Sequence, residues 1–406
     1  MTGHKQALGG VKVIEYAENV AGPYCGKLLA DFGAEVIKIE GLHVGDPSRK
    51  KGPFPGDIPH QEKSGLFLYL NTNKYGITLD LESIAGQEVF TKLINDADIL
   101  IEDKPPGGME RLGLGFEALR KVNPALIVVS ITPFGQTGPH AGYKAYPLNS
   151  VHCGMLGYLT PWVSRWPERE PIQPGGHLGE YGCGLSAATA TLAVLYLQRF
   201  TGKGQHIDIS KQEAIIALNR VNAPQFPNEG QSDTRFVNLS GLLGDIVPCK
   251  DGHIVFQINE THHWQGFVKL IGSPEWALDP IYLNGEERGK RFRTEIRPRI
   301  VEWARDYTKE ELYHRGQAAN CPFAVVNSPE DVVNSEHLKE RGFFVEVDHP
   351  AAGKIKQAGA PFILSETPWK IERPAPKLGE HNQEILCNKL GYSKLELLAY
   401  RSLGVI

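Results

Sequence analysis

The sequence predicts an α/β protein in which helices cover an open, parallel β-sheet. The first observation is a strand–helix–strand pattern, in which β-branched runs at 11–15 and 35–40 flank a helical pattern that Gly33 ends. Such a unit of about thirty residues is typical of parallel βαβ packing. The second observation is that apolar runs and helical patterns keep alternating as far as residue 209. Residues 1 to about 220 are therefore predicted to form this sheet and its helices.

The later elements of the sheet follow in order along the chain. Ser83 is expected to cap a helix that reaches Asn95, and a second helix is expected near 116–121. A run rich in Ala, Leu and Thr predicts a long helix at 185–199, whereas Gly, Pro and Asp predict a loop at 41–65. Further strands are predicted at 77–81, 98–102, 126–131 and 205–209.

A second, smaller α+β domain is expected in the middle of the chain, at 246–334. A stretch rich in Pro, Asn, Gly and Gln, 221–245, predicts a linker before it. A last helix is expected near the end of the chain, after a Pro-rich segment. The middle region has helical patterns at 262–271, 287–306 and 308–318 and strand patterns at 253–258 and 323–327, and the next strand patterns are at 343–347 and 360–364.

Composition and charge exclude several classes of protein. The chain has 406 residues, of which 41% are hydrophobic and 22% charged, as in ordinary soluble globular proteins of about two domains. A formal charge of −4 without a basic stripe argues against nucleic-acid binding. We expect neither a signal peptide nor a membrane span, because no long apolar run is present. Six widely separated cysteines predict free thiols and a cytoplasmic protein.

Common cofactor and metal motifs do not occur in the sequence. No G-x-G-x-x-G opens the first strand–helix unit, and there is no P-loop, H-E-x-x-H or G-x-S-x-G. His262 and His263 are adjacent, so they do not share one face of a helix and predict no metal site. Residues 103–111 follow the end of a predicted strand, and α/β sheets bind ligands outside the carboxyl ends of their strands. The alternative is that these residues form a solvated turn.

Glu180 is the main candidate for chemistry. It lies in a glycine-rich stretch, 175–184, just before the long predicted helix. Glycines let backbone approach a ligand, and a helix N-terminus offers free N–H groups and partial positive charge. The alternative is a surface acid in a first helical turn. His152 and His177 both precede Glu180 in the sequence; either could act as a base or be a structural histidine.

Several segments together resemble the class III CoA-transferases, the family of formyl-CoA and carnitine CoA-transferases and of 2-methylacyl-CoA racemases. The resemblance implies a Rossmann-like large domain built from both chain ends, 1–220 and 335–406, around the smaller domain. It also implies an interlocked dimer, coenzyme A or acyl-CoA as substrate, and no permanently bound cofactor. The segments that carry it are 21–23, 29–40, 45–46, 71–74, 77–80, 134–139, 201–205 and 341–344.

The family mechanism implied by this resemblance uses an aspartate nucleophile. The aspartate attacks the donor thioester to give an anhydride, and the released thiolate then forms an enzyme–CoA thioester that the acceptor acid resolves. Glu180 occupies the matching position with one methylene more, and a displacement of roughly an ångström can cost about a hundredfold in rate. The resemblance places Tyr146 near the reacting acyl group and implies coenzyme A contacts at Asn19, Val20, Leu79, Asp103, Arg111 and Lys144.

Other positions depart from the family's usual residues. Gly41 stands where an arginine often stacks on adenine, and Glu82 stands where a lysine is common. Asp103 would put negative charge where the CoA phosphates approach. These departures, together with Glu180, favour a non-catalytic subunit that pairs with an aspartate-bearing homologue.

Three functions remain open from the sequence. The favoured one resembles the heteromeric succinyl-CoA:benzylsuccinate CoA-transferase of anaerobic toluene degradation, with this chain as the silent subunit. The second is a self-sufficient CoA-transferase that uses Glu180 as its nucleophile. The third is a racemase-like enzyme in which His152 or Glu180 moves an α-proton.

Overall fold

A computed structural model of the chain describes residues 6–161, 168–219, 221–232, 234–235 and 244–406. The chain forms two compact units, Met1–Arg235 with Gly342–Ile406, and Phe236–Arg341. A short helix, α9 (Gln225–Glu229), lies inside the predicted linker. The predicted domain limits at 220, 246 and 335 remain predictions.

The larger unit is built on a six-stranded parallel sheet in the order β3–β2–β1–β4–β5–β6. This confirms the predicted α/β class. The third strand is Lys74–Thr78 rather than the predicted 77–81, and its start was missed because ionic partners completely bury the charged side chain of Lys74. The strands are β1 (Lys12–Tyr16), β2 (Glu35–Glu40), β3 (Lys74–Thr78), β4 (Ile99–Glu102), β5 (Ile127–Thr132) and β6 (His206–Ser210).

Helices cover both faces of this sheet, because successive strand side chains point to opposite sides. Val13 belongs to a core that includes residues of α1 (Ala21–Ala30) and α7 (Leu178–Thr201). Its neighbour Ile14 belongs to a second core that includes residues of α3 (Ile84–Asn95). The other helices that precede or follow the strands are α2 (Gly65–Leu70), α4 (Gly108–Arg111), α5 (Phe116–Val122), α6 (Pro147–Cys153) and α8 (Lys211–Leu218), with short 3-10 turns η1 (Pro47–Lys50) and η2 (Pro55–Asp57).

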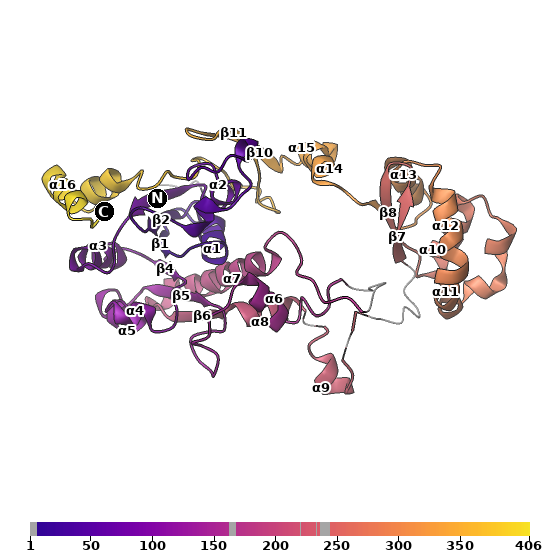
Figure 1. The fold of residues 1–406 in the computed structure, drawn as a ribbon, viewed down its shortest axis with the longest axis horizontal. Helices are drawn as coiled ribbons and strands as arrows, with labels where there is room; N and C mark the ends of the chain where they lie inside the picture. The colour runs from indigo at the N-terminus through magenta and orange to yellow at the C-terminus, as the bar shows by residue number, and fades with distance from the viewer. Residues whose placement is uncertain (1–5, 162–167, 220, 233, 236–243) are drawn as a thin grey trace. The chain divides into compact units, whose positions relative to one another are not determined.

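The C-terminal segment completes the second core. The π-helical segment η6 (Glu384–Lys389) and helix α16 (Lys394–Ser402) contribute residues that pack with those of β3 and α3. The Asp80 amide donates to the Val405 carbonyl at 2.8 Å. Figure 1 shows this yellow end of the chain beside the indigo N-terminal strands. Both chain ends therefore build the large unit, as predicted.

A hairpin of β10 (Phe344–His349) and β11 (Gly353–Ala358) precedes this segment. The prediction of a strand at 360–364 was wrong, since those residues form a bend and irregular backbone. Residues 353–358 were missed because lysines alternate with apolar residues in an exposed hairpin, which gives a weak hydrophobic signal. The turn between the two strands includes Gly353, whose φ of +72° is a backbone conformation that residues with a side chain rarely adopt.

The smaller unit has a three-stranded antiparallel sheet, β7–β8–β9, and an aromatic core around Trp264 and Phe267. The single helix predicted at 287–306 is broken by a π-helical segment, because Pro298 has no N–H to donate. The elements are β7 (Gly244–Cys249), β8 (Gly252–Gln257), α10 (Thr261–Leu270), η3 (Glu275–Leu278), η4 (Pro280–Leu283), α11 (Gly285–Arg291), η5 (Phe292–Ile296), α12 (Arg297–Ala304), α13 (Lys309–Ala318), β9 (Phe323–Val325), α14 (Pro329–Asn334) and α15 (Glu336–Glu340).

Two further predictions concern the chain as a whole. All six cysteines are free thiols, as the spacing predicted. Among the residues that the structure describes, every helix is too short or too polar to cross a membrane.

Candidate active site

Glu180 lies in the first turn of α7. The helix starts at Leu178, seven residues before the predicted start, because the five glycines of 175–184 hid its beginning in the sequence. His177 precedes the helix in a left-handed conformation with φ of 57°. Glu180 is only 4% exposed, so the alternative of a surface acid is wrong.

The glycines of this turn serve helix packing. A methyl group at Gly184 would lie 2.6 Å from the Ala21 carbonyl oxygen of α1, and one at Gly179 would lie 2.9 Å from the Ile215 Cδ1 atom of α8. Real Cβ atoms essentially never make contacts this short, so neither position accepts a side chain without a shift of its neighbour. The expectation that the glycines serve ligand approach is therefore replaced by a packing role at these two positions.

Lys211 is the ionic partner of Glu180. Its Nζ atom lies 2.7 Å from Glu180 Oε2, and the two side chains are 19% and 5% exposed. Burial lowers the pKa of Lys211, but the Glu180 charge and hydrogen bond outweigh burial and raise the pKa above its ordinary value. Lys211 follows β6 directly and starts α8, which the Ser210 hydroxyl caps. Sequence reasoning missed it, because a lysine at the start of a helix looks like a surface residue.

Asp103 lies at the same edge of the sheet, one residue after β4. Its Oδ2 atom accepts a hydrogen bond from the Glu18 amide at 2.8 Å, and its Oδ1 atom lies 3.6 Å from Lys104 Nζ. Burial raises the pKa of Asp103, whereas the charges of Lys104 and Lys211 oppose the rise. The carboxyl ends of β1, β4 and β6 thus gather acidic and basic groups, as expected for the ligand-binding edge of an α/β sheet.

Glu102, at the end of β4, is a second buried acid beside Asp103. Burial raises its pKa to about 7, although hydrogen bonds from Ser130 and the Lys104 amide favour the charged form. Ser130 in turn lies 2.8 Å from His206 Nε2. The edge of the sheet therefore holds a second buried carboxyl group, whose pKa burial moves to near neutral pH.

The loop after β1 is fixed by hydrogen bonds. Asn19 has φ of 64°; its amide donates to Asp46 Oδ1 at 3.0 Å, and its side-chain oxygen accepts from Lys51 Nζ at 2.8 Å. Val20 and Leu79 are each only 2% exposed, so their side chains belong to the core. Contacts of Val20 and Leu79 with coenzyme A remain predictions, and they would have to use the main chain.

A buried ionic network of Lys38, Lys74, Glu15 and Asp46 holds this loop against the sheet. Lys38 Nζ lies 3.1 Å from Glu15 and 2.9 Å from Asp46, and Lys74 Nζ lies 2.8 Å from Glu15. Burial lowers the pKa of Lys74 to about 8, despite the Glu15 charge. Burial also acts to lower the pKa of Lys38, but Asp46 and Glu15 outweigh it and raise that pKa. Lys38 donates to the Ala17 carbonyl as well, so the network ties β2 to the loop.

The remaining predicted site residues lie at the surface. Arg111 pairs with Glu82 at 3.0 Å, and both side chains are about two-thirds exposed. Lys144 is exposed, and Tyr146, at the start of α6, is 78% exposed. The roles of Arg111, Lys144 and Tyr146 in binding or catalysis remain predictions.

The two histidines near Glu180 are placed differently. The His152 ring bonds to the Leu148 carbonyl of its own helix at 2.9 Å. His177 immediately precedes α7.

Among the described residues, no group of three or more His, Cys, Asp or Glu side chains could hold a metal ion.

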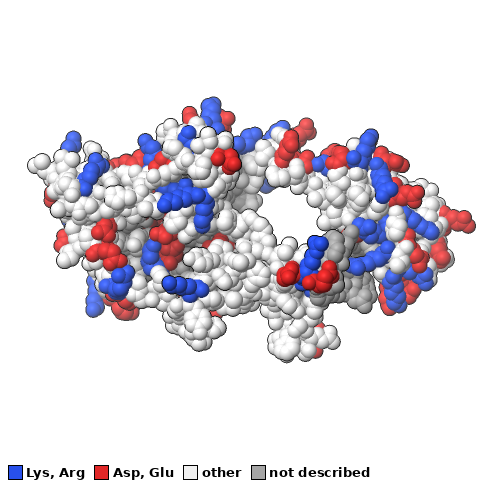
Figure 2. Space-filling view, viewed as in Figure 1, with Lys and Arg blue, Asp and Glu red and all other residues white. Residues whose placement is uncertain are grey.

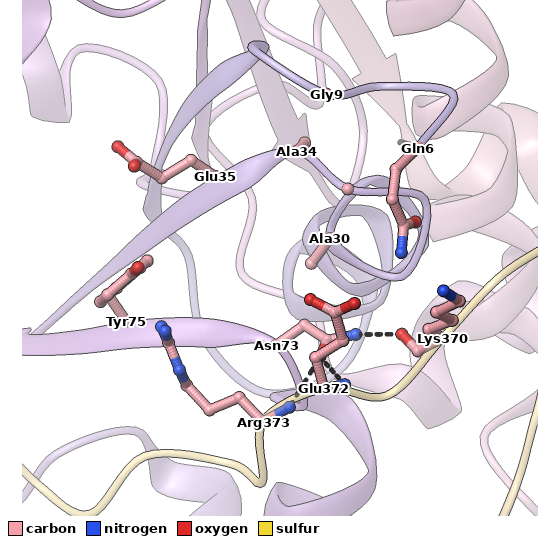
Figure 3. A pocket seen from close by; sticks show the side chains of 11 residues that line it. Gln6, Gly9, Ala30, Ala34, Glu35, Asn73, Tyr75, Lys370, Glu372 and Arg373 are labelled. Atoms are coloured by element: carbon pink, nitrogen blue, oxygen red, sulfur yellow. Dashed lines mark hydrogen bonds between the residues drawn. The ribbon is translucent and has the colours of Figure 1, made fainter. Parts of the chain in front are cut away.

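A roomy pocket lies at the opposite edge of the sheet, where β2 and β3 begin (Figure 3). Its volume is about 570 Å³. The Asn73 side chain donates to the Lys370 carbonyl and accepts from the amides of Glu372 and Arg373, which holds the C-terminal segment in place. Ligands of open α/β sheets bind outside the carboxyl ends of the strands, so this pocket is a poor candidate for the active site despite its size.

Comparisons with known proteins agree with the fold and identify the family. Residues 8–382 match the family model described as CoA-transferase family III. The chain is 32% identical to a formyl-CoA:oxalate CoA-transferase of Streptomyces coelicolor, covering 99% of each chain. It is 34% identical to a protein of the same name from Bradyrhizobium sp. (strain ORS 278), covering 99% of this chain and 97% of the relative. A crystal structure of a CAIB/BAIF family protein from Brucella suis superposes with a TM-score of 0.84 at 29% identity, covering 94% of this chain and 99% of the other.

Proposed function

The chain belongs to CoA-transferase family III, and on that basis we propose that it is the non-catalytic subunit of an enzyme that moves coenzyme A from an acyl-CoA to a carboxylic acid. The observation that carries the proposal is the buried ion pair of Glu180 and Lys211. In this proposal, a homologous subunit that bears the family aspartate performs the exchange. Coenzyme A enters as a substrate thioester rather than as a resident cofactor.

The ion pair works against a covalent intermediate on Glu180. Forming an anhydride or a thioester converts the carboxylate to a neutral group, which leaves the Lys211 ammonium buried without its closest counterion. Breaking a buried pair in this way costs about 3–5 kcal/mol. At about 1.4 kcal/mol per factor of ten, that cost slows or disfavours the step by more than a hundredfold. The extra methylene of Glu180 adds a misplacement to this cost.

An exposed apolar face of α7 supports a partner subunit. Leu185, Leu192, Tyr196 and Phe200 follow one stripe of the helix at helical spacing, and they are 53%, 42%, 71% and 72% exposed. Figure 2 shows a broad white area, with few Lys, Arg, Asp or Glu side chains, over α6, α7 and α8. Exposed apolar patches of this kind mark interaction sites. We propose that a homologous chain, or a second copy of this chain, covers it in an interlocked dimer.

A self-sufficient CoA-transferase is the second candidate. The position of Glu180 favours it: the carboxylate lies in the first turn of a helix, at the edge of the sheet where family substrates would bind. The racemase-like function has less support, because the ring of His152 is bonded to its own helix.

The deciding experiment is a CoA-exchange assay on the purified chain, alone and co-expressed with an aspartate-bearing homologue. The donor and acceptor pairs are formyl-CoA with oxalate, after the relatives' name, and succinyl-CoA with benzylsuccinate. We expect turnover only with the homologue present, unchanged by Glu180→Gln. Turnover by the chain alone that Glu180→Gln abolishes would replace the proposal with the self-sufficient enzyme. Deuterium exchange at the α-carbon without CoA exchange would favour the racemase.

A further inference from the structure

We infer that Lys211 is a positioning residue that holds the Glu180 carboxylate in an unreactive ion pair, so that a neutral residue at position 211 opens Glu180 to acylation by acyl-CoA. The inference rests on the proposed function, in which the natural chain is silent. It goes further by naming the residue responsible and by making the silence reversible.

The local structure holds the Lys211 ammonium in place. Ser210 caps α8, and the Gln212 amide donates to the Pro133 carbonyl at 3.1 Å, so the backbone on both sides of Lys211 is fixed. The ammonium reaches Glu180 Oε2 at 2.7 Å in a site where both side chains are largely buried. Water screens such a pair less than it screens an ion pair at the surface, so the charge of Lys211 acts strongly on Glu180.

The chemistry shows why this cation opposes reaction. In the first step, a Glu180 oxygen attacks the thioester carbonyl carbon, the carbon–sulfur bond breaks, and coenzyme A leaves as a thiolate. In the second step, the thiolate attacks the Glu180 carbonyl carbon, and the donor acid leaves as a carboxylate. Glu180 carries a charge before these steps and none after either of them. Lys211 therefore stabilises the starting state more than the intermediates, which is the opposite of catalysis.

The carboxylate keeps other support when Lys211 is replaced. The first turn of α7 still offers unpaired N–H groups and the positive end of the helix dipole, which favour an ionised Glu180. Lys211→Met keeps most of the length and the apolar stem of the side chain, and it removes the charge together with the hydrogen bond to Glu180. Lys211→Arg keeps the charge and serves as the conservative control.

The test is covalent trapping of Glu180. Each purified full-length variant is incubated with formyl-CoA or succinyl-CoA at mildly alkaline pH and quenched with hydroxylamine, and the peptide that contains Glu180 is analysed by mass spectrometry. We expect Lys211→Met to trap about a hundredfold more label than the natural chain. We also expect Lys211→Arg and the exposed-lysine control Lys203→Met to match the natural chain, and Lys211→Met with Glu180→Gln to trap none.

The outcomes separate the two proposals. Label on Glu180 of the natural chain would overturn the silent-subunit proposal. If neither the natural chain nor the folded Lys211→Met variant traps label on Glu180, the role of Lys211 would be overturned, and the silent-subunit proposal would stand. If Lys211→Met fails to fold, Lys211→Gln takes its place, because glutamine keeps a hydrogen bond without the charge. Added methylammonium should suppress the labelling of Lys211→Ala, a rescue that a merely structural lysine would not show.

Discussion

Replacing Lys38 by methionine is expected to destabilise the larger unit by about 3–5 kcal/mol, the cost of breaking a buried ion pair. Lys38 is completely buried and is the ionic partner of Asp46 at 2.9 Å. When Lys38 is replaced, Glu15 still has Lys74 as its ionic partner. Burial alone raises the pKa of Asp46, and the Lys38 charge reverses that effect. The variant therefore leaves a carboxylate buried without a cation.

The sign of the pH dependence follows from this change. In the variant, the folded state raises the Asp46 pKa above its unfolded value, so the folded state binds the extra proton. Stability then falls as the pH rises through the window between the two pKa values. The loss is therefore smallest in acid, where Asp46 is protonated, and complete near neutral pH.

Hydrogen exchange of the β1 and β2 amides in increasing urea, read by mass spectrometry, reports on the larger unit alone. The matched control is Lys12→Met: Lys12 pairs with Asp96 at the surface, and the change should stay below about 1 kcal/mol. Adding Asp46→Asn to Lys38→Met should recover at least about half of the loss. A cost of Lys38→Met no larger than that of the control, or no recovery from Asp46→Asn, would refute the reasoning.

Three further changes test the site and its surroundings. Burial raises the pKa of Glu102 from 4.5 to about 7, so the stability of the natural chain should fall by on the order of 3 kcal/mol as the pH rises from 4.5 to 7. Glu102→Gln should reduce this dependence of stability on pH, as measured by urea unfolding, and an unchanged dependence would contradict the assignment. Gly184→Ala should cost about 1–3 kcal/mol in thermal unfolding by overpacking against Ala21, and a loss under about 0.5 kcal/mol would count against the contact. Glu82→Gln should strengthen coenzyme A binding up to about fivefold in low-salt calorimetry by freeing Arg111, and equal affinity would remove Arg111 from the predicted contacts.

The sheet could be predicted largely from the sequence, because β-branched runs mark buried parallel strands. The strand at 35–40 was predicted with its observed limits. The errors have physical causes: the start of β3 carries Lys74, which is buried by long-range partners, and β11 is an exposed hairpin strand. Local sequence shows neither burial by distant charges nor pairing with a neighbouring strand.

The candidate site was only partly predictable. The glycine-rich stretch and the family resemblance located Glu180 just before a predicted helix, whereas it lies in the first turn of that helix. Its burial and its partner Lys211 come from the packing of α7 against α8 after β6, a contact between residues 31 positions apart. The sequence shows that residue 103 is an acid, but it does not show that burial raises the pKa of Asp103, because that burial comes from the neighbouring strands.

The close contact of α1 and α7 has a mechanical consequence. The two helices touch where Gly184 meets the Ala21 carbonyl, next to the loop of Asn19 and one turn after Glu180. With no side chain between the backbones, there is no slack to absorb a displacement. We therefore expect the Asn19 loop and the first turn of α7 to shift together, so that a ligand that displaces this loop also displaces the carboxyl group of Glu180.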